Sequence, residues 1–178
     1  MKRHASIVLA GLLALSLGVA PVTHATTKSA ATATTAGAAT WEVTSGLGDD
    51  GATVNLFLPG TIHAYVGDTV RWHVEGIIEL HTITFGPAAT MQQLAAHVLV
   101  PVPQKAGPPL LTLNAQLAAP SGGPSYDGMG FHNSGLLFPT PGQIVTYKLT
   151  FTAPGTYHYI CLIHRGMDGY IHVLPAGS

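Results

Sequence analysis

The residues of this chain that could do chemistry gather around its only cysteine. Cys161 is followed by His164 and Met167, so a thiol, an imidazole and a thioether fall within a short run directly after a strand-like segment. Soft sulfur together with nitrogen is a donor set that suits copper. Because strand side chains alternate, the pattern Tyr157, Tyr159, Cys161 places the thiol at the end of a rigid element. The spacing therefore predicts a metal site in the loop that follows.

A complete site needs a second imidazole from elsewhere in the chain. One Cys and two His in a trigonal arrangement, with a weak axial Met, form the blue-copper electron-transfer site. Three-residue separations let a tight loop fold its donors back toward one point, whereas extended chain would spread them by roughly 10 Å each. The best candidate for the missing donor lies in the strand-like residues 79–85. The predicted ligands of one copper ion are His81, Cys161, His164 and Met167.

The other histidines do not lie in a sequence context that suggests a copper ligand. We expect ordinary sandwich or surface positions for His63, His73, His97, His132 and His158, and a solvent-facing position for His172 in the last strand.

The composition favours a β fold. The chain has 178 residues, of which 8% are charged, with 21 Gly and 13 Pro. This composition suits short strands and many turns rather than a helical bundle. The formal net charge of −1 provides no basic surface for nucleic acid.

Turn signals divide most of the chain into short strands. Seven or so such strands predict an all-β, antiparallel sandwich; they cover residues 54–58, 61–66, 69–74, 80–85, 145–152, 155–161 and 169–174. Residues 90–100 could form a short helix. Residues 86–143 break the rhythm and are predicted to be a long, partly helical insertion, and a loop of this length is usually functional or disordered. Within it we expect Tyr126 and Phe131 to pack on the sandwich, and the roles of Met129 and His132 stay open.

The N-terminal sequence predicts export. A basic start, an uncharged apolar stretch over residues 5–20 and the small residues around Ala25 are typical of a signal peptide at residues 1–25. An uncleaved anchor is the alternative. Residues 26–40, almost entirely Thr and Ala, are expected to be a flexible leader, and residues 41–178 the folded domain. The expected location is the periplasm or the outside of the cell, with no stable membrane insertion after cleavage.

The chain resembles a known family in two stretches. The run from Pro154 to Cys161 with His164 and Met167, and upstream the runs 66–72 and 81–85, are similar to those of cupredoxins of the plastocyanin/azurin group. The Cys-x-x-His-x-x-Met spacing most resembles the short ligand loop of amicyanin. The resemblance implies a Greek-key β-sandwich and a type 1 copper site with the ligands named above. Many cupredoxins have an Asn after the first His ligand, and this chain has Thr82 there.

The resemblance also implies a function. We expect a small electron carrier that is a monomer, exchanges electrons through the edge of His164 and docks transiently with a redox protein. Copper storage or delivery through the same ligands is the main alternative. An enzyme is not expected: a thiol hydrolase would leave Met167 unexplained, and a copper oxidase or nitrite reductase would need further ligands or a second domain.

Overall fold

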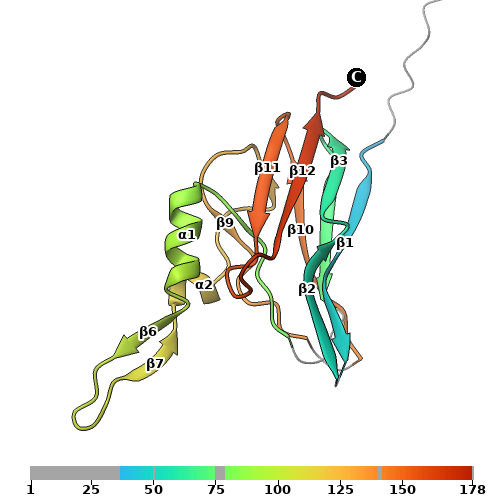
Figure 1. The fold of residues 1–178 in the computed structure, drawn as a ribbon. Coiled ribbons are helices and arrows are strands. Elements are labelled where there is room, and N and C mark those ends of the chain that lie inside the picture. Colours follow the sequence, from blue (N-terminus) through green and yellow to red (C-terminus); the bar gives the residue numbers. More distant parts are fainter. Residues whose placement is uncertain (1–36, 50, 75–78, 140–141, 178) are drawn as a thin grey trace, which may run out of the picture. The chain divides into compact units, whose positions relative to one another are not determined.

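The structure is a computed structural model that describes residues 37–49, 51–74, 79–139 and 142–177 (Figure 1). The predicted signal peptide at residues 1–25 and residues 26–36 of the predicted leader lie outside the described residues. Of that leader, residues 37–40 are described, and Thr40 already begins the first strand. The described part of the chain holds no helix that is long and apolar enough to span a membrane.

The described residues form two five-stranded sheets, which confirms the predicted all-β sandwich. The first sheet has the order β2-β1-β4-β10-β8, built from Ala52–Leu58, Thr40–Asp49, Thr69–Val74, Val145–Phe151 and Ser125–Tyr126. The second has the order β3-β12-β11-β5-β9, built from Thr61–Tyr65, Asp168–Leu174, Gly155–Ile160, Thr84–Phe85 and His132–Asn133. Most neighbours are antiparallel, but β1–β4, β10–β8 and β12–β3 are parallel.

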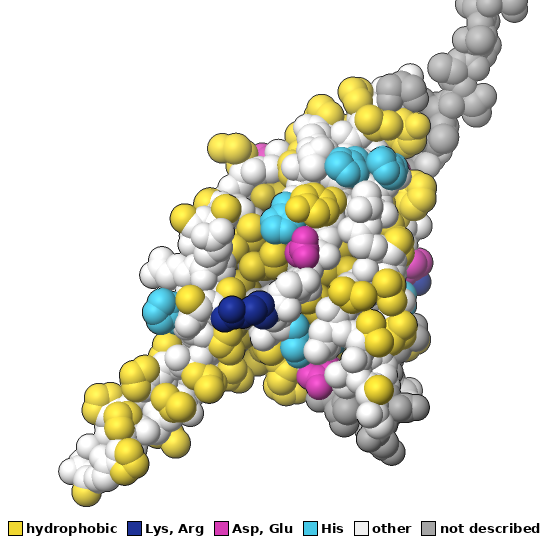
Figure 2. Space-filling model, in the orientation of Figure 1, with side chains coloured by type: hydrophobic (Ala, Val, Ile, Leu, Met, Phe, Trp, Pro, Cys, Tyr) yellow, Lys and Arg dark blue, Asp and Glu magenta, His cyan; other side chains and the backbone are white. Residues whose placement is uncertain are grey.

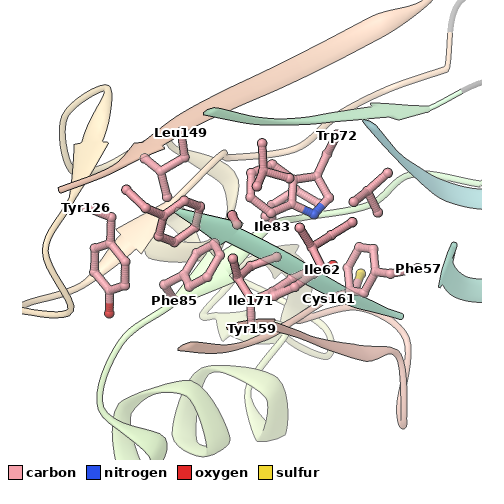
Figure 3. Close-up of a cluster of buried hydrophobic side chains, with 14 of the residues drawn as sticks. Phe57, Ile62, Trp72, Ile83, Phe85, Tyr126, Leu149, Tyr159, Cys161 and Ile171 are labelled. Atoms are coloured by element: carbon pink, nitrogen blue, oxygen red, sulfur yellow. The ribbon is translucent and has the colours of Figure 1, made fainter. Parts of the chain in front are cut away.

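Aromatic side chains join the two sheets. The Tyr159 ring of β11 lies 4.6 Å from Phe57, 5.3 Å from Trp72 and 5.1 Å from Phe85, measured between ring centroids. These four side chains are at most 2% exposed (Figure 3). Alternate residues of β4 are buried, as a strand with one face on the core requires. Cys161 belongs to this core cluster, so its sulfur is fixed by well-packed neighbours.

The segment 86–143 is more than an insertion, because it also completes both sheets. It contains α1 (Ala88–Ala96), the hairpin of β6 (Leu99–Val102) and β7 (Leu110–Leu113), and α2 (Ala115–Ala118). The hairpin extends away from the sandwich in Figure 1. Further along, β8 pairs with β10 and β9 pairs with β5, each at a sheet edge. Tyr126 is buried against Phe85, as expected, Phe131 is half-buried against the cluster of Leu94, Leu117 and Leu162, and Met129 is 72% exposed.

Two strand predictions need correction. The predicted strand 80–85 is reduced to Thr84–Phe85 and an isolated bridge between His81 and Leu137. The reason is that a side chain interrupts the ladder: the Ile83 amide donates to Ser134 Oγ at 2.8 Å. The second correction is a strand that the sequence analysis missed: β1 was not predicted at all. Its alternation is broken at Gly46, where the pairing with β2 shifts register.

Candidate metal centre

Three of the predicted ligands meet at one end of the sandwich. Cys161 Sγ lies 3.6 Å from His164 Nδ1 and 3.9 Å from His81 Nδ1, and the two nitrogens are 3.2 Å apart. Three donors around one ion, with bonds of about 2.0–2.3 Å as for zinc, would lie roughly 3.5–3.8 Å from one another. The observed triangle therefore fits a single metal ion. Within the described residues it is the one group of three or more His, Cys, Asp or Glu donors with such spacing.

The fourth predicted ligand lies in the same tight loop. The Cys161 amide donates to the Met167 carbonyl at 2.9 Å, and the Met167 amide donates to the His164 carbonyl at 3.2 Å. These bonds close the loop over residues 161–167 back on itself. Met167 is 1% exposed, so its thioether is buried with the other donors rather than directed to solvent. Its role as an axial ligand stays a prediction.

Thr82 connects the two segments that carry the predicted ligands. Its hydroxyl accepts a hydrogen bond from the Leu162 amide at 2.8 Å, and its own amide donates to Cys161 Sγ at 3.4 Å. Thr82 is fully buried. The residue that departs from the family pattern therefore joins the segment of His81 to the loop of Cys161 through both its side chain and its backbone.

Residues of the insertion extend the hydrogen-bond network of Thr82. The Thr84 hydroxyl lies 3.3 Å from Thr82 Oγ1 and donates to Asn133 Oδ1 at 3.0 Å. The Asn133 side chain donates in turn to the carbonyls of Gln116, Leu117 and Ala119, around α2. Because the Thr82, Thr84 and Asn133 side chains are buried and polar, loss of one of these bonds would leave a buried group unsatisfied. The network makes α2 and β9 part of the structure that positions the predicted ligands.

Gly46 is a further positioning residue that the sequence did not reveal. It has φ of +73°, and a Cβ at this position would overlap the His81 imidazole ring. The bulge of β1 therefore lets the backbone lie directly against a predicted ligand. The glycine and the break in strand alternation are visible in the sequence, but their proximity to His81 is a tertiary feature.

The environment of Cys161 favours the thiolate. Burial alone would raise the pKa of the thiol, but hydrogen bonds from His164, His81 and the backbone at Thr82 and Ile163 lower the pKa to about 5. The pKa of His164 is raised, mainly by its hydrogen bond to Cys161, with a smaller contribution from Glu79. Because the thiolate is the form of cysteine that binds metals, the site is prepared for an ion at neutral pH.

The outer side of the cluster is covered by a carboxylate. Glu79 Oε2 lies 3.1 Å from His164 Nε2, the ring nitrogen that faces away from Cys161. The His164 side chain is 15% exposed, whereas His81 and Cys161 are 1% and 3% exposed. A carboxylate on the second nitrogen of a ligating histidine fixes the tautomer and the ring orientation. Glu79 was not identified from the sequence, where no motif marks it.

The remaining described histidines lie outside this cluster, as expected. His97 bonds the Gln93 carbonyl, and His132 accepts from the Gly123 amide. His158 lies 3.4 Å from Asp168. His73 contacts Thr44. His63 and His172 are neighbours on the outer face of the second sheet.

Comparisons with known proteins give structural neighbours only. No family model and no curated protein sequence matches the chain. Among solved structures, reduced auracyanin from Roseiflexus castenholzii matches with 20% identity and a TM-score of 0.45, covering 79% of this chain and 100% of that one. A purple cupredoxin from Nitrosopumilus maritimus matches with 16% identity and a TM-score of 0.43, covering 75% of this chain and 99% of that one.

An amicyanin variant in the Cu(I) form matches with 18% identity and a TM-score of 0.42, covering 76% of this chain and 82% of that one. The clustered donors agree with the predicted resemblance to cupredoxins. The case for copper in this chain rests on its own donor set and geometry.

Proposed function

We propose that the chain is a type 1 copper protein that acts as a small electron carrier, with His81, Cys161 and His164 as ligands and Met167 as the axial ligand. One observation carries the proposal: a buried triangle of one thiol and two imidazoles, held by two segments that Thr82 fastens together. This donor set and its approximately trigonal arrangement are those of blue-copper sites.

Copper, when bound, supplies a one-electron couple between Cu(I) and Cu(II). The contribution of the protein is rigidity. The sulfur is fixed within the core, the loop closes on itself through Met167, and the network from Thr82 to Asn133 resists movement of either ligand segment. Ligands that move little between two oxidation states keep the reorganisation energy small, which favours rapid electron exchange.

His164 is the proposed exit for the electron. It is the most exposed of the three clustered donors, and it lies beside a groove of about 700 Å³ between α1 and the ligand loop. Gln92, Ala95 and Ala96 line the helix side of this groove. This arrangement fits a monomer that docks transiently with a redox protein. The apolar N-terminal sequence fits a location in the periplasm or outside the cell.

A thiol-dependent enzyme fits less well. A nucleophilic thiolate must reach its substrate, but Cys161 is 3% exposed and packs within the core cluster. The low pKa of this thiol follows from its hydrogen bonds to His164 and His81, and a metal site needs the same thiolate.

Electron self-exchange tests the proposed role against copper storage. We expect copper-loaded protein to exchange electrons rapidly between its oxidised and reduced forms, measured by NMR line broadening in mixtures of the two. Slow exchange combined with ready transfer of copper to a chelator would contradict the carrier role and favour storage or delivery.

The axial role of Met167 has its own test. Met167→Leu should keep the blue colour and raise the reduction potential, because loss of a thioether donor weakens binding of Cu(II) more than of Cu(I). An unchanged or lowered potential in voltammetry would contradict the assignment.

A further inference from the structure

The outer face of the second sheet carries a row of stacked rings. His63 of β3 lies beside His172 of β12, with ring centroids 5.0 Å apart and planes inclined by 22°. Tyr170 follows at 6.5 Å from His172, and His158 of β11 lies 4.8 Å from Tyr170. Figure 2 shows histidine side chains gathered over this part of the molecule. The row lies outside the copper centre: His172 is four residues beyond Asp168, or about 13 Å along the strand from the ligand loop.

We propose that His63 and His172 form a second metal site, which binds a divalent first-row ion at the surface, Cu(II) most tightly and Zn(II) less so. Imidazole suits both ions, and Cu(II) ranks above Zn(II) in affinity for nitrogen donors. Without a thiolate or thioether, the pair has no soft donor to favour Cu(I).

The backbone brings the two imidazoles within chelating reach. His63 and His172 are direct partners in the parallel pairing of β3 with β12. Two nitrogens bound to one ion at about 2.0–2.1 Å lie roughly 3 Å apart. The rings are now 5.0 Å apart between centroids, so a tilt of the rings brings one nitrogen of each to a common ion. His63 is exposed and His172 half-buried, so the first is the one with space to turn.

A hydroxyl already orients the less mobile ring. Thr156 Oγ1 of β11 lies 2.9 Å from His172 Nδ1. A hydrogen bond on one ring nitrogen holds the ring in place and leaves the other nitrogen for the metal, as in established metal sites. His172 would therefore bind through Nε2, with Thr156 as its positioning residue.

His158 provides the matched control. It is exposed on the same face, but the Tyr170 ring packs against it at a tilt and its Nε2 lies 3.4 Å from Asp168. It does not belong with His63 and His172 to any group of three clustered donors among the described residues. The proposed site is thus a pair rather than a triad.

The test uses protein whose sulfur site is already loaded with copper. On adding one further equivalent of Cu(II) at pH 7.5, we expect a second EPR signal with wide copper hyperfine splitting, lost in His63→Ala and in His172→Ala but kept in His158→Ala. Thr156→Val should weaken this binding while leaving the sheet intact. Acidification should release the ion, because a histidine nitrogen must be free of its proton to bind a metal.

Three outcomes would overturn the proposal. The second signal could be absent at stoichiometric Cu(II), it could persist in either the His63 or the His172 variant, or it could be lost equally in His158→Ala. Circular dichroism of each variant separates loss of a ligand from loss of the fold. The blue absorption of the sulfur site should be unchanged throughout, so failure of this proposal is distinguishable from failure of the proposed electron carrier.

Discussion

Two pairs of histidine rings in this molecule have nearly the same spacing and very different surroundings. The His81 and His164 rings are 4.8 Å apart, and the His63 and His172 rings are 5.0 Å apart. The first pair is at most partly exposed, has a sulfur within 4 Å of each ring and is held by buried hydrogen bonds. The second pair lies on an outer sheet face with one hydroxyl as a partner.

Ring spacing alone therefore does not define a metal site. The thiolate selects the ion, burial excludes water, and the surrounding hydrogen bonds set how much the ligands can move. We expect a tight, redox-active centre at the first pair and a labile, exposed one at the second.

Removing the sulfur should make the first site resemble the second. In Cys161→Ser the intense blue absorption should be lost completely, because that band requires a copper–thiolate bond. Any copper that remains should give an EPR spectrum with wide hyperfine splitting, as expected for the surface pair. His158→Ala is the control and should keep the colour; a blue Cys161→Ser protein would contradict the ligand assignment.

The thiol of metal-free protein should ionise far below its usual pKa of 9.0. We expect a midpoint of about 5 in the ultraviolet absorption of the thiolate, because His164 and His81 bond to the sulfur. His164→Ala should raise this midpoint. The Cys161→Ser protein supplies the baseline, and a native midpoint near 9 would show that the imidazoles do not stabilise the thiolate.

The same ionisation should affect stability in a defined direction. A depressed folded-state pKa stabilises the protein fully above the unfolded pKa of 9.0, and this contribution is lost as the pH falls through about 5. The raised pKa of His164 acts in the opposite sense: its contribution is present below 6.5 and is lost as the pH rises through the folded-state value. From these two groups, the free energy of unfolding of metal-free protein, measured by urea denaturation, should rise between pH 5 and about 6.5. It should level off between 6.5 and the folded-state pKa of His164, where the two effects oppose each other, and rise again from there toward pH 9.0.

Removing the hydrogen bond between Thr82 and Leu162 should have a moderate effect on stability. Thr82→Val keeps the shape of the side chain but leaves the buried Leu162 amide without its acceptor. We expect the free energy of unfolding of metal-free protein to fall by about 1–3 kcal/mol in urea denaturation. Thr146→Val, on an exposed position of β10, is the matched control, and equal effects in the two variants would argue against a special role for Thr82.

Neutralising the carboxylate at the edge of the site should have the smallest effect. Glu79→Gln keeps an acceptor for His164 Nε2 but removes a negative charge that favours Cu(II), so the reduction potential should rise slightly. The Glu79 side chain is 37% exposed, so solvent screens much of the charge. Glu42→Gln is the control: it removes the ion pair between Glu42 and Arg71 in the first sheet and should leave the reduction potential unchanged. A drop in potential in Glu79→Gln would contradict this role.

The sequence predicted the elements whose pattern is local. Six strands show clear alternation or end at turn signals, and the donors of the ligand loop are close in sequence, so both could be recognised directly. His81 was identified through its segment, although that segment forms only a bridge and a two-residue strand.

The remaining features depend on contacts between distant residues. β1 contains two glycines and forms a strand because β2 and β4 flank it. Gly46 against His81, Glu79 against His164 and Asn133 behind Thr84 become visible only when the chain is folded. The edge strands β8 and β9 are two residues long and have no periodicity to detect.

The visible absorption and EPR spectra of the protein after addition of one equivalent of Cu(II) test the central claim most directly. We expect an intense blue band with narrow copper hyperfine splitting, because the copper would be bound to the Cys161 thiolate between two imidazoles. A pale spectrum with wide splitting would contradict it, and would mean that Cu(II) binds to histidines without the sulfur.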